Sequence, residues 1–444
     1  MNLQLSQFCH VFPEKGVLWH SLKRRIFRFP SAVLVKLQRS RMQGVEEDWR
    51  RLVGNEFDAL RSAGYIVTEV EDALLLIEAQ EASGPQGIQG LFLMLTAICN
   101  LVCDYCLFAQ KGSESLTQPA RYMSPDTARK GIDLFAKLTQ SNQKDADGYW
   151  EQITFYGGEP LLNPHCLTEA VKHIRQVQKT GLLVENLSLV INTNGTKINE
   201  EFARFAHAES IEVQISIDGI HAHDKRRFDR SGKGSLESVL AGVGSLVKHQ
   251  ARFLPMITIS PANVDHLTET VLWLHETFGI AEYGATIVMS GTDKLEPNFP
   301  KRVADAMLQT YFEARKVSVR DAGFASIWEN LFQAGVRREE CGASRKIVVF
   351  PQGELHTCQA LETSGLTSCG TLQSPLMDSE NRQQWRRRNR FNNPICKKCP
   401  AVGVCGGGCG AGSYHVAGDI QVIDPNTCGM TLELLQRWLD SQIS

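Results

Sequence analysis

The middle of the chain alternates short apolar runs with longer amphipathic stretches. The apolar runs have the length and composition of buried strands, and they lie at residues 91–95, 152–156, 187–192, 212–217, 254–259 and 281–289. Helical patterns separate them, for example over residues 126–138, 167–178 and 199–208. Because strands that alternate with helices form parallel βα units, residues 90–300 are expected to fold as a partial (β/α)6 barrel. In such barrels the chemistry lies at the carboxyl ends of the strands.

Residues 1–85 carry a different order of patterns. Their apolar runs predict strands over residues 8–12, 17–19, 26–29, 65–70 and 74–77. Their amphipathic stretches predict helices over residues 31–41 and 45–62. Strands followed by helices indicate a separate winged-helix-like unit, and Ser83-Gly84-Pro85-Gln86-Gly87 is the expected linker to the barrel.

The last third of the chain divides into two parts. Residues 301–340 are expected to form a helical bridge. From Cys341 to the end, the sequence is rich in Cys, Gly and Pro and has few long apolar periods. A segment with so little apolar surface to bury is expected to depend on metal for its fold.

Composition limits the classes of function that remain open. A chain of 444 residues predicts two or three domains. Its 47 Lys and Arg nearly balance its 49 Asp and Glu, which argues against a nucleic-acid binder. Neither an apolar run of membrane-spanning length nor a signal-peptide core occurs, so we expect a cytoplasmic protein without a membrane partner.

The thirteen cysteines are the unusual feature of the composition. The cytoplasm keeps thiols reduced, so clustered cysteines there indicate metal binding more often than disulfides. Cys99, Cys103 and Cys106 form C-x3-C-x2-C directly after the first barrel strand. Three thiolates on a short loop can bind three irons of a cubane cluster and leave the fourth iron open. A zinc loop is the alternative, but it needs a fourth ligand and none is adjacent.

This motif resembles the signature of the radical S-adenosylmethionine (radical SAM) superfamily, C-x3-C-x-aromatic-C, with Tyr105 as the aromatic residue. The resemblance implies a 4Fe-4S cluster whose open iron binds the amine and carboxylate of SAM. It also implies that one electron from the cluster cleaves SAM to a 5′-deoxyadenosyl radical. Tyr105 would then lie against the adenine, although simple packing explains the residue equally well.

Three further matches to the superfamily end the next three strands: Gly157-Gly158-Glu159-Pro160, Asn192-Thr193-Asn194-Gly195 and Ser216-Ile217-Asp218-Gly219. Glycines allow the backbone to approach a ligand closely, and Glu159 offers a carboxylate for the SAM ammonium group. Ordinary turns are the alternative. The SAM contacts that the resemblance implies are Tyr105, Gly157, Gly158, Glu159, Asn194 and Ser216. Arg227 could bind the methionyl carboxylate, but a solvated surface position is the favoured interpretation of this residue.

A second cysteine group occupies the C-terminal region. Cys341, Gly353 and Cys358 form C-x11-G-x4-C, and C-x2-C-x5-C-x3-C follows over residues 396–409 before Cys428. This pattern resembles the SPASM extension of radical SAM enzymes, which implies two auxiliary 4Fe-4S clusters. The resemblance assigns Cys341, Cys358 and Cys409 to one cluster, and it assigns Cys396, Cys399, Cys405 and Cys428 to the other.

The first of these clusters has three assigned ligands. Cys369 could be the fourth, or the site could be open, and the sequence leaves the two alternatives equal. Cys9 and Cys166 are expected to be buried small apolar residues. A zinc ribbon is the competing interpretation, but it explains neither the first cysteine group nor the barrel.

SPASM enzymes mostly modify peptides and proteins, and residues 1–85 resemble the precursor-peptide recognition element of such enzymes. That resemblance implies a leader peptide paired against a strand edge; capping of the barrel is the alternative. We therefore expect a peptide maturase that abstracts a hydrogen atom and forms a C–C, C–O or C–S cross-link, or an epimer. The overall plan is similar to enzymes that make triceptides and darobactin. A flavodoxin- or ferredoxin-type protein would supply electrons.

Two other functions remain open at this stage. Anaerobic sulfatase-maturing enzymes carry an Asp base after the second SPASM cysteine, where this chain has Gln359, which cannot act as a base. A zinc-stabilised binding scaffold without catalysis is the alternative from another class.

The basic run from Trp385 to Arg390 is expected to be a solvated helix face, and His221 and His223 receive no role.

Overall fold

The computed structural model describes residues 2–40, 43–82, 87–106, 121–140, 150–293, 295–322, 328, 331, 336 and 341–442. Residues 83–86 of the predicted linker and most of the predicted helical bridge beyond residue 322 lie outside this set.

A ten-stranded sheet forms the centre of the molecule, in the order β13-β12-β11-β10-β9-β8-β7-β14-β15-β16. All pairs from β13 to β14 are parallel, and β15 and β16 continue the sheet in antiparallel fashion. The six predicted strands are β7 (Gly90–Thr96), β8 (Gln152–Gly157), β9 (Ser188–Thr193), β10 (Ile211–Ser216), β11 (Phe253–Ile259) and β12 (Glu282–Ile287). The others are β13 (Arg320–Asp321), β14 (Lys346–Val349), β15 (Glu354–His356) and β16 (Ser368–Thr371).

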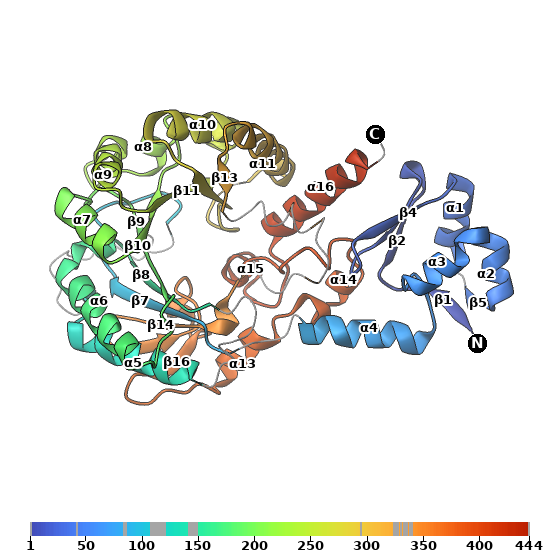
Figure 1. Cartoon of the computed structure of the whole chain (residues 1–444), viewed down its shortest axis with the longest axis horizontal. Coiled ribbons are helices and arrows are strands. Elements are labelled where there is room, and N and C mark those ends of the chain that lie inside the picture. Colours follow the sequence, from blue (N-terminus) through green and yellow to red (C-terminus); the bar gives the residue numbers. More distant parts are fainter. Residues whose placement is uncertain are drawn as a thin grey trace.

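Helices cover the outer face of this curved sheet (Figure 1). They are α5 (Pro125–Thr139), α6 (Pro164–Lys179), α7 (Glu200–Ala208), α9 (Leu236–Lys248), α10 (Leu267–Phe278) and α11 (Phe299–Lys316), and the short α8 (His223–Arg226) follows β10. Ser124 and Asn199 cap α5 and α7 by accepting a bond from a backbone N–H.

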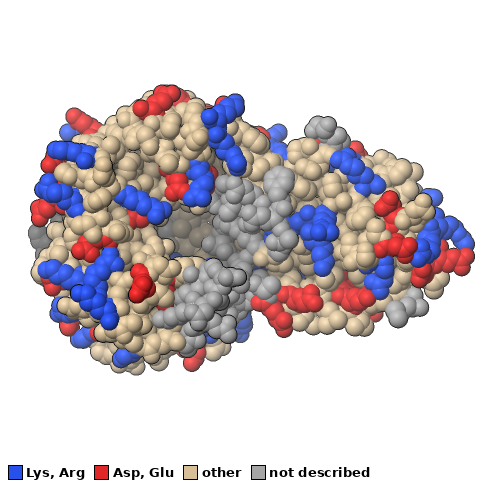
Figure 2. All heavy atoms as spheres, in the orientation of Figure 1, with Lys and Arg blue, Asp and Glu red and all other residues tan. Residues whose placement is uncertain are grey.

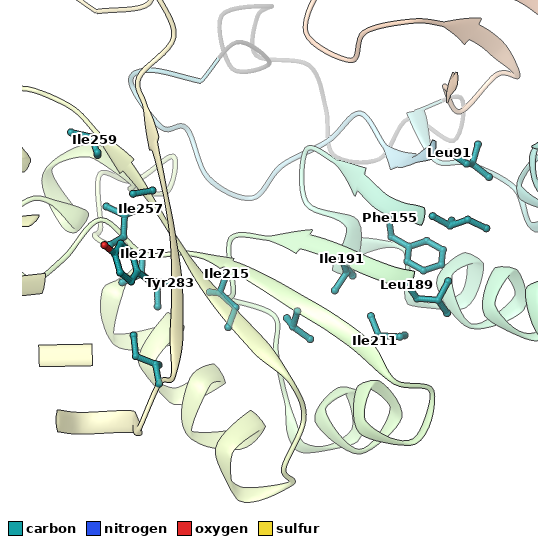
Figure 3. Packing of buried hydrophobic residues seen from close by; sticks show 14 of the residues in the cluster. Leu91, Phe155, Leu189, Ile191, Ile211, Ile215, Ile217, Ile257, Ile259 and Tyr283 are labelled. Carbon is teal, nitrogen blue, oxygen red and sulfur yellow. The ribbon is translucent and has the colours of Figure 1, made fainter. Parts of the chain in front are cut away.

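Alternate strand residues divide the sheet between two cores. Leu91, Phe155, Leu189, Ile215 and Ile257 point toward the helices and form the main core (Figure 3). The intervening residues on the other face form a smaller cluster of Phe92, Met94, Tyr156, Val348 and Phe350. This inner face is therefore apolar where β7, β8 and β14 meet, and the loops at the carboxyl ends of the strands lie beside it.

The N-terminal residues form a unit with its own core. Strands β2 (Cys9–Phe12), β3 (Val17–His20) and β4 (Arg25–Arg28) make one antiparallel sheet, and β1 (Leu3–Leu5), β5 (Gln43–Gly44) and β6 (Ile66–Val67) make another. Helices α1 (Ser31–Ser40), α2 (Glu46–Val53) and α3 (Phe57–Ser62) pack on them. Leu18, Leu34, Trp49, Phe57 and Tyr65 form the core.

The strand predicted at residues 74–77 is wrong, because these residues lie in helix α4 (Glu69–Ala82). Thr68 and Glu71 form a capping box: the Thr68 N–H donates to the Glu71 carboxylate at 2.7 Å, and the Glu71 N–H donates to Thr68 Oγ1 at 3.3 Å. Leu75 and Ala79 then pack against Phe391. A continuous apolar run fits a strand or a buried helix, and the cap decides between them here.

The C-terminal region lies between the N-terminal unit and the large sheet (Figure 1). It contains α13 (Glu380–Arg387), α14 (Pro394–Lys397), α15 (Gly410–Ala417) and α16 (Pro425–Ser441). The centres of the Trp19 and Trp438 indole rings lie 5.0 Å apart, and this contact joins the N-terminal unit to α16. Among the helices that the structure describes, none has the length and apolar character needed to cross a membrane.

Candidate functional site

The first cysteine group lies in the loop that follows β7. Burial, the Glu159 carboxyl and the neighbouring thiols of Cys103 and Cys106 raise the pKa of Cys99 to about 12. Burial is also the main cause that raises the pKa of Cys103, to about 11. These two thiols ionise near neutral pH only when a cation lies beside them, and an iron–sulfur cluster supplies that cation. The residues present therefore fit the cluster that the motif predicts.

Backbone amides donate to the sulfur atoms of both cysteine groups. Leu101 N lies 3.4 Å from Cys99 Sγ, Ala401 N 3.4 Å from Cys399 Sγ, and Gly407 N 3.3 Å from Cys405 Sγ. Ala360 N likewise donates to Cys358 Sγ at 3.4 Å, and Gly412 N donates to Cys409 Sγ at 3.5 Å. Such bonds stabilise thiolates and tune the reduction potential of a cluster.

Gly157 and Gly158 hold the loop after β8 directly against the cysteine loop. A Cβ on Gly158 would lie 2.3 Å from the Ile98 carbonyl oxygen, and one on Gly157 would lie 2.2 Å from that of Thr96. Glu159 N also donates to the Ile98 carbonyl at 2.8 Å. Only glycine fits so close an approach between two backbones. The contacts of these glycines with SAM remain predictions.

Glu159 is fully buried and braces the ends of β8 and β9. Its carboxylate accepts bonds from the Thr193 hydroxyl at 2.7 Å, Asn194 N at 2.7 Å and Leu161 N at 3.0 Å. The sequence did not reveal this bracing role. The contact with the SAM ammonium group remains a prediction.

Asn194 reaches the first cysteine group, whereas Ser216 lies half-buried at the end of β10. Asn194 Nδ2 is 3.6 Å from Cys99 Sγ and 3.0 Å from Asn100 Oδ1. The structure thus brings the ends of β7, β8 and β9 together at Cys99.

Tyr105, Asp218 and Arg227 form a buried network beside this group. The Tyr105 hydroxyl donates to Asp218 Oδ2 at 2.5 Å, and Arg227 Nε donates to the same oxygen at 2.7 Å. Thr258 N donates to Asp218 Oδ1 at 3.0 Å. Arg227 is 7% exposed, so its favoured interpretation as a solvated residue is wrong. Sequence reasoning gave Asp218 no role, although its position after a strand end was a usable signal.

The cysteines of the second group lie in two separate places. Cys396, Cys399, Cys405 and Cys428 line one cavity of about 210 Å³. Cys341, Cys358 and Cys409 lie together in a separate cluster with Trp385 and Tyr414. Burial and then the Cys341 thiol raise the pKa of Cys409 to about 12. Both sets of thiols therefore fit a metal cluster for the same reason as the first group.

Cys369 does not lie in either set. It is fully buried in the main core of the large sheet. Its thiol is 3.5 Å from the Thr367 carbonyl and 3.7 Å from the Ser379 hydroxyl. Cys166 is likewise buried inside α6, and Cys9 Sγ lies 3.8 Å from the Tyr65 carbonyl. The structure thus places three thiols in the set of Cys341.

The basic run is not a solvated helix face throughout, contrary to the prediction. Arg388 donates to the carbonyls of Gly407 at 2.7 Å and Ile420 at 2.7 Å, and Arg390 donates to that of Val402 at 2.6 Å. These carbonyls belong to the loops that carry the cysteines. The arginines lie 12 to 32 positions from these carbonyls in the sequence, so no local pattern predicts the hydrogen bonds.

Asp424 is a second residue that the sequence analysis missed. It is buried and accepts bonds from Ser290 Oγ at 2.5 Å, Thr427 Oγ1 at 2.7 Å and Cys409 N at 3.0 Å. Its own carbonyl accepts from Cys428 N at 3.0 Å. One residue therefore ties the two sets of C-terminal cysteines to each other and to the loop after β12.

The inner face of the sheet also carries polar groups. Burial, followed by the Cys106 and Cys358 thiols, raises the pKa of Tyr156 to about 12. Lys346 Nζ donates to Gln359 Oε1 at 3.0 Å and lies 4.4 Å from the centre of the Phe92 ring. Figure 2 shows a hollow at the centre of this lobe of the molecule.

Comparisons with known proteins agree with this geometry. The sequence pattern of the radical SAM superfamily matches residues 93–274. The serine-type anaerobic sulfatase-maturating enzyme of Bacteroides thetaiotaomicron is 28% identical over 171 residues, which are 38% of this chain and 39% of that enzyme. The radical SAM cyclopropyl synthase TigE of Paramaledivibacter caminithermalis is 20% identical over 80% of this chain and 75% of that enzyme.

A solved structure extends the likeness to the N-terminal unit. Streptococcus suis SuiB, bound to its precursor peptide SuiA, superimposes with a TM-score of 0.56 at 12% identity. The match covers 96% of this chain and 99% of SuiB. At this identity it shows a shared fold, mixed α/β with a parallel sheet.

Proposed function

Because the chain is a radical SAM enzyme of the SPASM-type peptide-modifying family, we propose that it matures a ribosomally synthesised precursor peptide by forming a side-chain cross-link. SAM and a 4Fe-4S cluster, when bound, supply a 5′-deoxyadenosyl radical that removes a hydrogen atom from the substrate. Cys99, Cys103 and Cys106 would hold that cluster, and Asn194 and Tyr105 lie beside it. The two C-terminal sets of cysteines would hold auxiliary clusters.

The residues on the inner face of the sheet suit a peptide substrate. Phe92, Met94 and Phe350 supply an apolar floor that excludes water. Lys346 and Gln359 supply a cation and an amide at one side of it. A peptide backbone or acidic side chain placed there would be oriented by these two groups, between Tyr156 and Cys358.

The N-terminal unit supplies a site for a leader peptide. Among the strands that the structure describes, β4 is the last of its sheet, so none of them pairs with its second edge. A groove of about 560 Å³ lies beside it. Its lining includes Arg25, Ile26 and Phe27 of β4, Ala59 and Ser62 of α3, Ala63 just after α3, and Trp438 and Gln442 at the end of the C-terminal region. An extended peptide can add to such an edge, with its side chains in the groove. This groove, in the same chain as the three sets of cysteines, is the observation that carries the proposal.

The sulfatase-maturing alternative has specific support in the identity to the Bacteroides enzyme. Gln359 argues against it, because an amide that accepts a bond from Lys346 offers no base for the oxidation of a Cys or Ser side chain. The zinc-scaffold alternative is set aside by membership of an enzyme family.

Co-expression with a small peptide encoded beside the gene tests the main proposal. We expect the intact mass of the peptide to fall by two hydrogens per modification, with fragmentation placing the link between two side chains. Cys99→Ala should leave the mass unchanged. An unmodified peptide in the presence of an iron-loaded enzyme that still cleaves SAM would contradict the proposal and favour a protein substrate.

The leader site has a separate test. Ala59→Trp would fill the groove, and we expect it to weaken binding of the precursor at least tenfold in anaerobic fluorescence titrations. Glu56→Trp, at an exposed position outside the groove, is the matched control. Equal affinities of the two variants would exclude the groove as the leader site without affecting the assignment of the chemistry.

A further inference from the structure

Two histidines and a glutamate, none of them part of the three sets of cysteines, meet in the loops that follow β10 and β11. His221 Nε2 lies 2.8 Å from Glu269 Oε1, and His266 Nδ1 lies 3.1 Å from Glu269 Oε2. The two imidazole rings stack with their centres 4.1 Å apart and their planes at 26°. One ligand atom from each residue lies within 4.8 Å of the others.

The fold builds this cluster from two separate loops. His221 follows β10, whereas His266 follows β11 and Glu269 lies in the first turn of α10. Gly219, with φ at 86°, brings the first loop onto α10, since a Cβ there would lie 2.2 Å from Thr270 Oγ1. Asn263 Nδ2 joins the loops by donating to the carbonyls of Asp218 at 3.3 Å and Thr258 at 3.0 Å. These contacts fix the cluster independently of its own side chains.

We propose that His221, His266 and Glu269 bind one divalent transition-metal ion, zinc in the cell, which clamps the loops after β10 and β11 together. Two imidazoles and one carboxylate, with water in the fourth position, are an established ligand set for zinc. Ligands at zinc bond lengths in a tetrahedron lie about 3.3 Å apart. The two nitrogen–oxygen separations of 2.8 and 3.1 Å, to different oxygens of Glu269, are close to this value, and the remaining separation within 4.8 Å would have to shorten by no more than about 1.5 Å.

Metal binding would also prevent the repulsion that two charged imidazoles would have in the stacked pair. Each ring nitrogen that faces Glu269 is now in a hydrogen bond, and a metal ion takes the place of the proton at each nitrogen. Two protonated imidazoles at 4.1 Å would repel each other, whereas two neutral imidazoles and a carboxylate attract a divalent cation. The residues are half-buried or exposed, so the ion and its water have access.

The clamp would act on the loop that positions Asp218. Asp218 lies three positions before His221 in this loop, and its carboxylate accepts hydrogen bonds from Tyr105 and Arg227. A metal ion at the rim would therefore stiffen the support of the network beside the first cysteine group. This is a structural role, distinct from the chemistry of the family.

Zinc binding to the anaerobically reconstituted holoenzyme tests the proposal, because cluster formation occupies the clustered thiols. The enzyme would be stripped with chelator, desalted and titrated with zinc sulfate against a fluorescent zinc indicator. We expect the wild type to bind one zinc ion per chain more than the His221→Ala/His266→Ala variant. His173→Ala is the matched control, since His173 pairs with Asp133 at 2.7 Å but has no second imidazole.

Equal zinc stoichiometry in the wild type and the double variant would overturn the proposal. Iron content and the thermal unfolding midpoint would show whether the double variant is folded. If it is not, Glu269→Gln provides the test, because it keeps the size of the side chain and removes the charge, and it should lose the same zinc ion. Zinc should also slow hydrogen exchange in residues 218–222 and 260–266 of the wild type only; unchanged exchange would likewise count against the clamp.

Discussion

Asp218 shows how much one buried carboxylate organises at the scale of a residue. It is 2% exposed, and it binds a phenol, a guanidinium and a backbone amide from three different segments. The sequence placed it at a strand end but could not show its partners, because Tyr105 is 113 positions away. Long-range polar pairs of this kind leave no periodic signal.

Asp218→Asn should destabilise the enzyme strongly. The substitution keeps the size of the side chain but leaves the Arg227 guanidinium buried without its counter-charge. Breaking a buried ion pair in this way costs about 3–5 kcal/mol. Asp265→Asn is the control, since Asp265 pairs with Arg302 at the surface and should cost under about 1 kcal/mol. The measurement is the free energy of unfolding by urea under anaerobic conditions; equal losses in the two variants would contradict the assigned role of Asp218.

His20 predicts a pH dependence of stability. Burial is the main cause that lowers the pKa of this histidine to about 3, from an ordinary value of 6.5. The unfolded chain therefore binds a proton that the folded chain rejects, and stability falls as the pH drops below about 6.5, by up to about 1.4 kcal/mol per pH unit. We expect His20→Gln to flatten this slope between pH 6.5 and 5. The check is the unfolding midpoint against pH, with exposed His165→Gln as the control; a parallel slope in His20→Gln would refute it.

Strands β7 to β12 of the large sheet were predictable because each is a short apolar run between helical patterns. Leu91, Leu93 and Leu95 illustrate this, since they alternate with Phe92 and Met94 across the two faces of β7. Strands β13 to β16 were not predicted, although β14 to β16 extend the sheet from the cysteine-rich region. The prediction failed at residues 74–77, where four consecutive apolar residues carry no period. The spacing of the cysteines drew attention to their loops, whereas it gave no sign of Arg388 and Asp424, which bind those loops.

Gly158→Ala should separate the loop after β8 from the cysteine loop. The added methyl group would meet backbone atoms of Ile98 and Cys99, which cannot rotate away. We expect the variant to retain less iron per chain after reconstitution than the wild type and to unfold at a lower temperature. Gly244→Ala in α9 is the control: its Cβ meets nothing within 4 Å, and alanine favours the helix by about 1 kcal/mol. Full iron content in Gly158→Ala would contradict this account.

At the scale of the whole molecule, one short segment of the C-terminal region makes several of the contacts that hold the N-terminal unit. Trp19 Nε1 donates to the Pro400 carbonyl at 2.8 Å, and Arg24 Nη2 donates to the Gly403 carbonyl at 2.8 Å. A Cβ on Gly403 would lie 2.1 Å from the Ser21 carbonyl oxygen. This segment lies between Cys399 and Cys405, so the two regions share a contact at the proposed auxiliary site.

Trp19→Phe should weaken that contact, because it keeps an aromatic side chain but removes the indole N–H. The Pro400 carbonyl would lose its donor, at a cost of about 1–3 kcal/mol. Hydrogen exchange in the peptide that spans residues 399–405 should become faster. Trp273→Phe in α10, far from this segment in sequence and fold, should leave that peptide unchanged. Identical exchange in both variants would show that the indole bond does not hold the segment.

The shared segment has a consequence for how the enzyme matures in the cell. Residues 400–403 lie between Cys399 and Cys405, so a cluster held by these cysteines would help to fix their positions. A newly made chain that has not received iron would then hold its N-terminal unit less firmly. Delivery of the metal would favour capture of the precursor, and an incompletely assembled enzyme would bind less of a peptide that it cannot process.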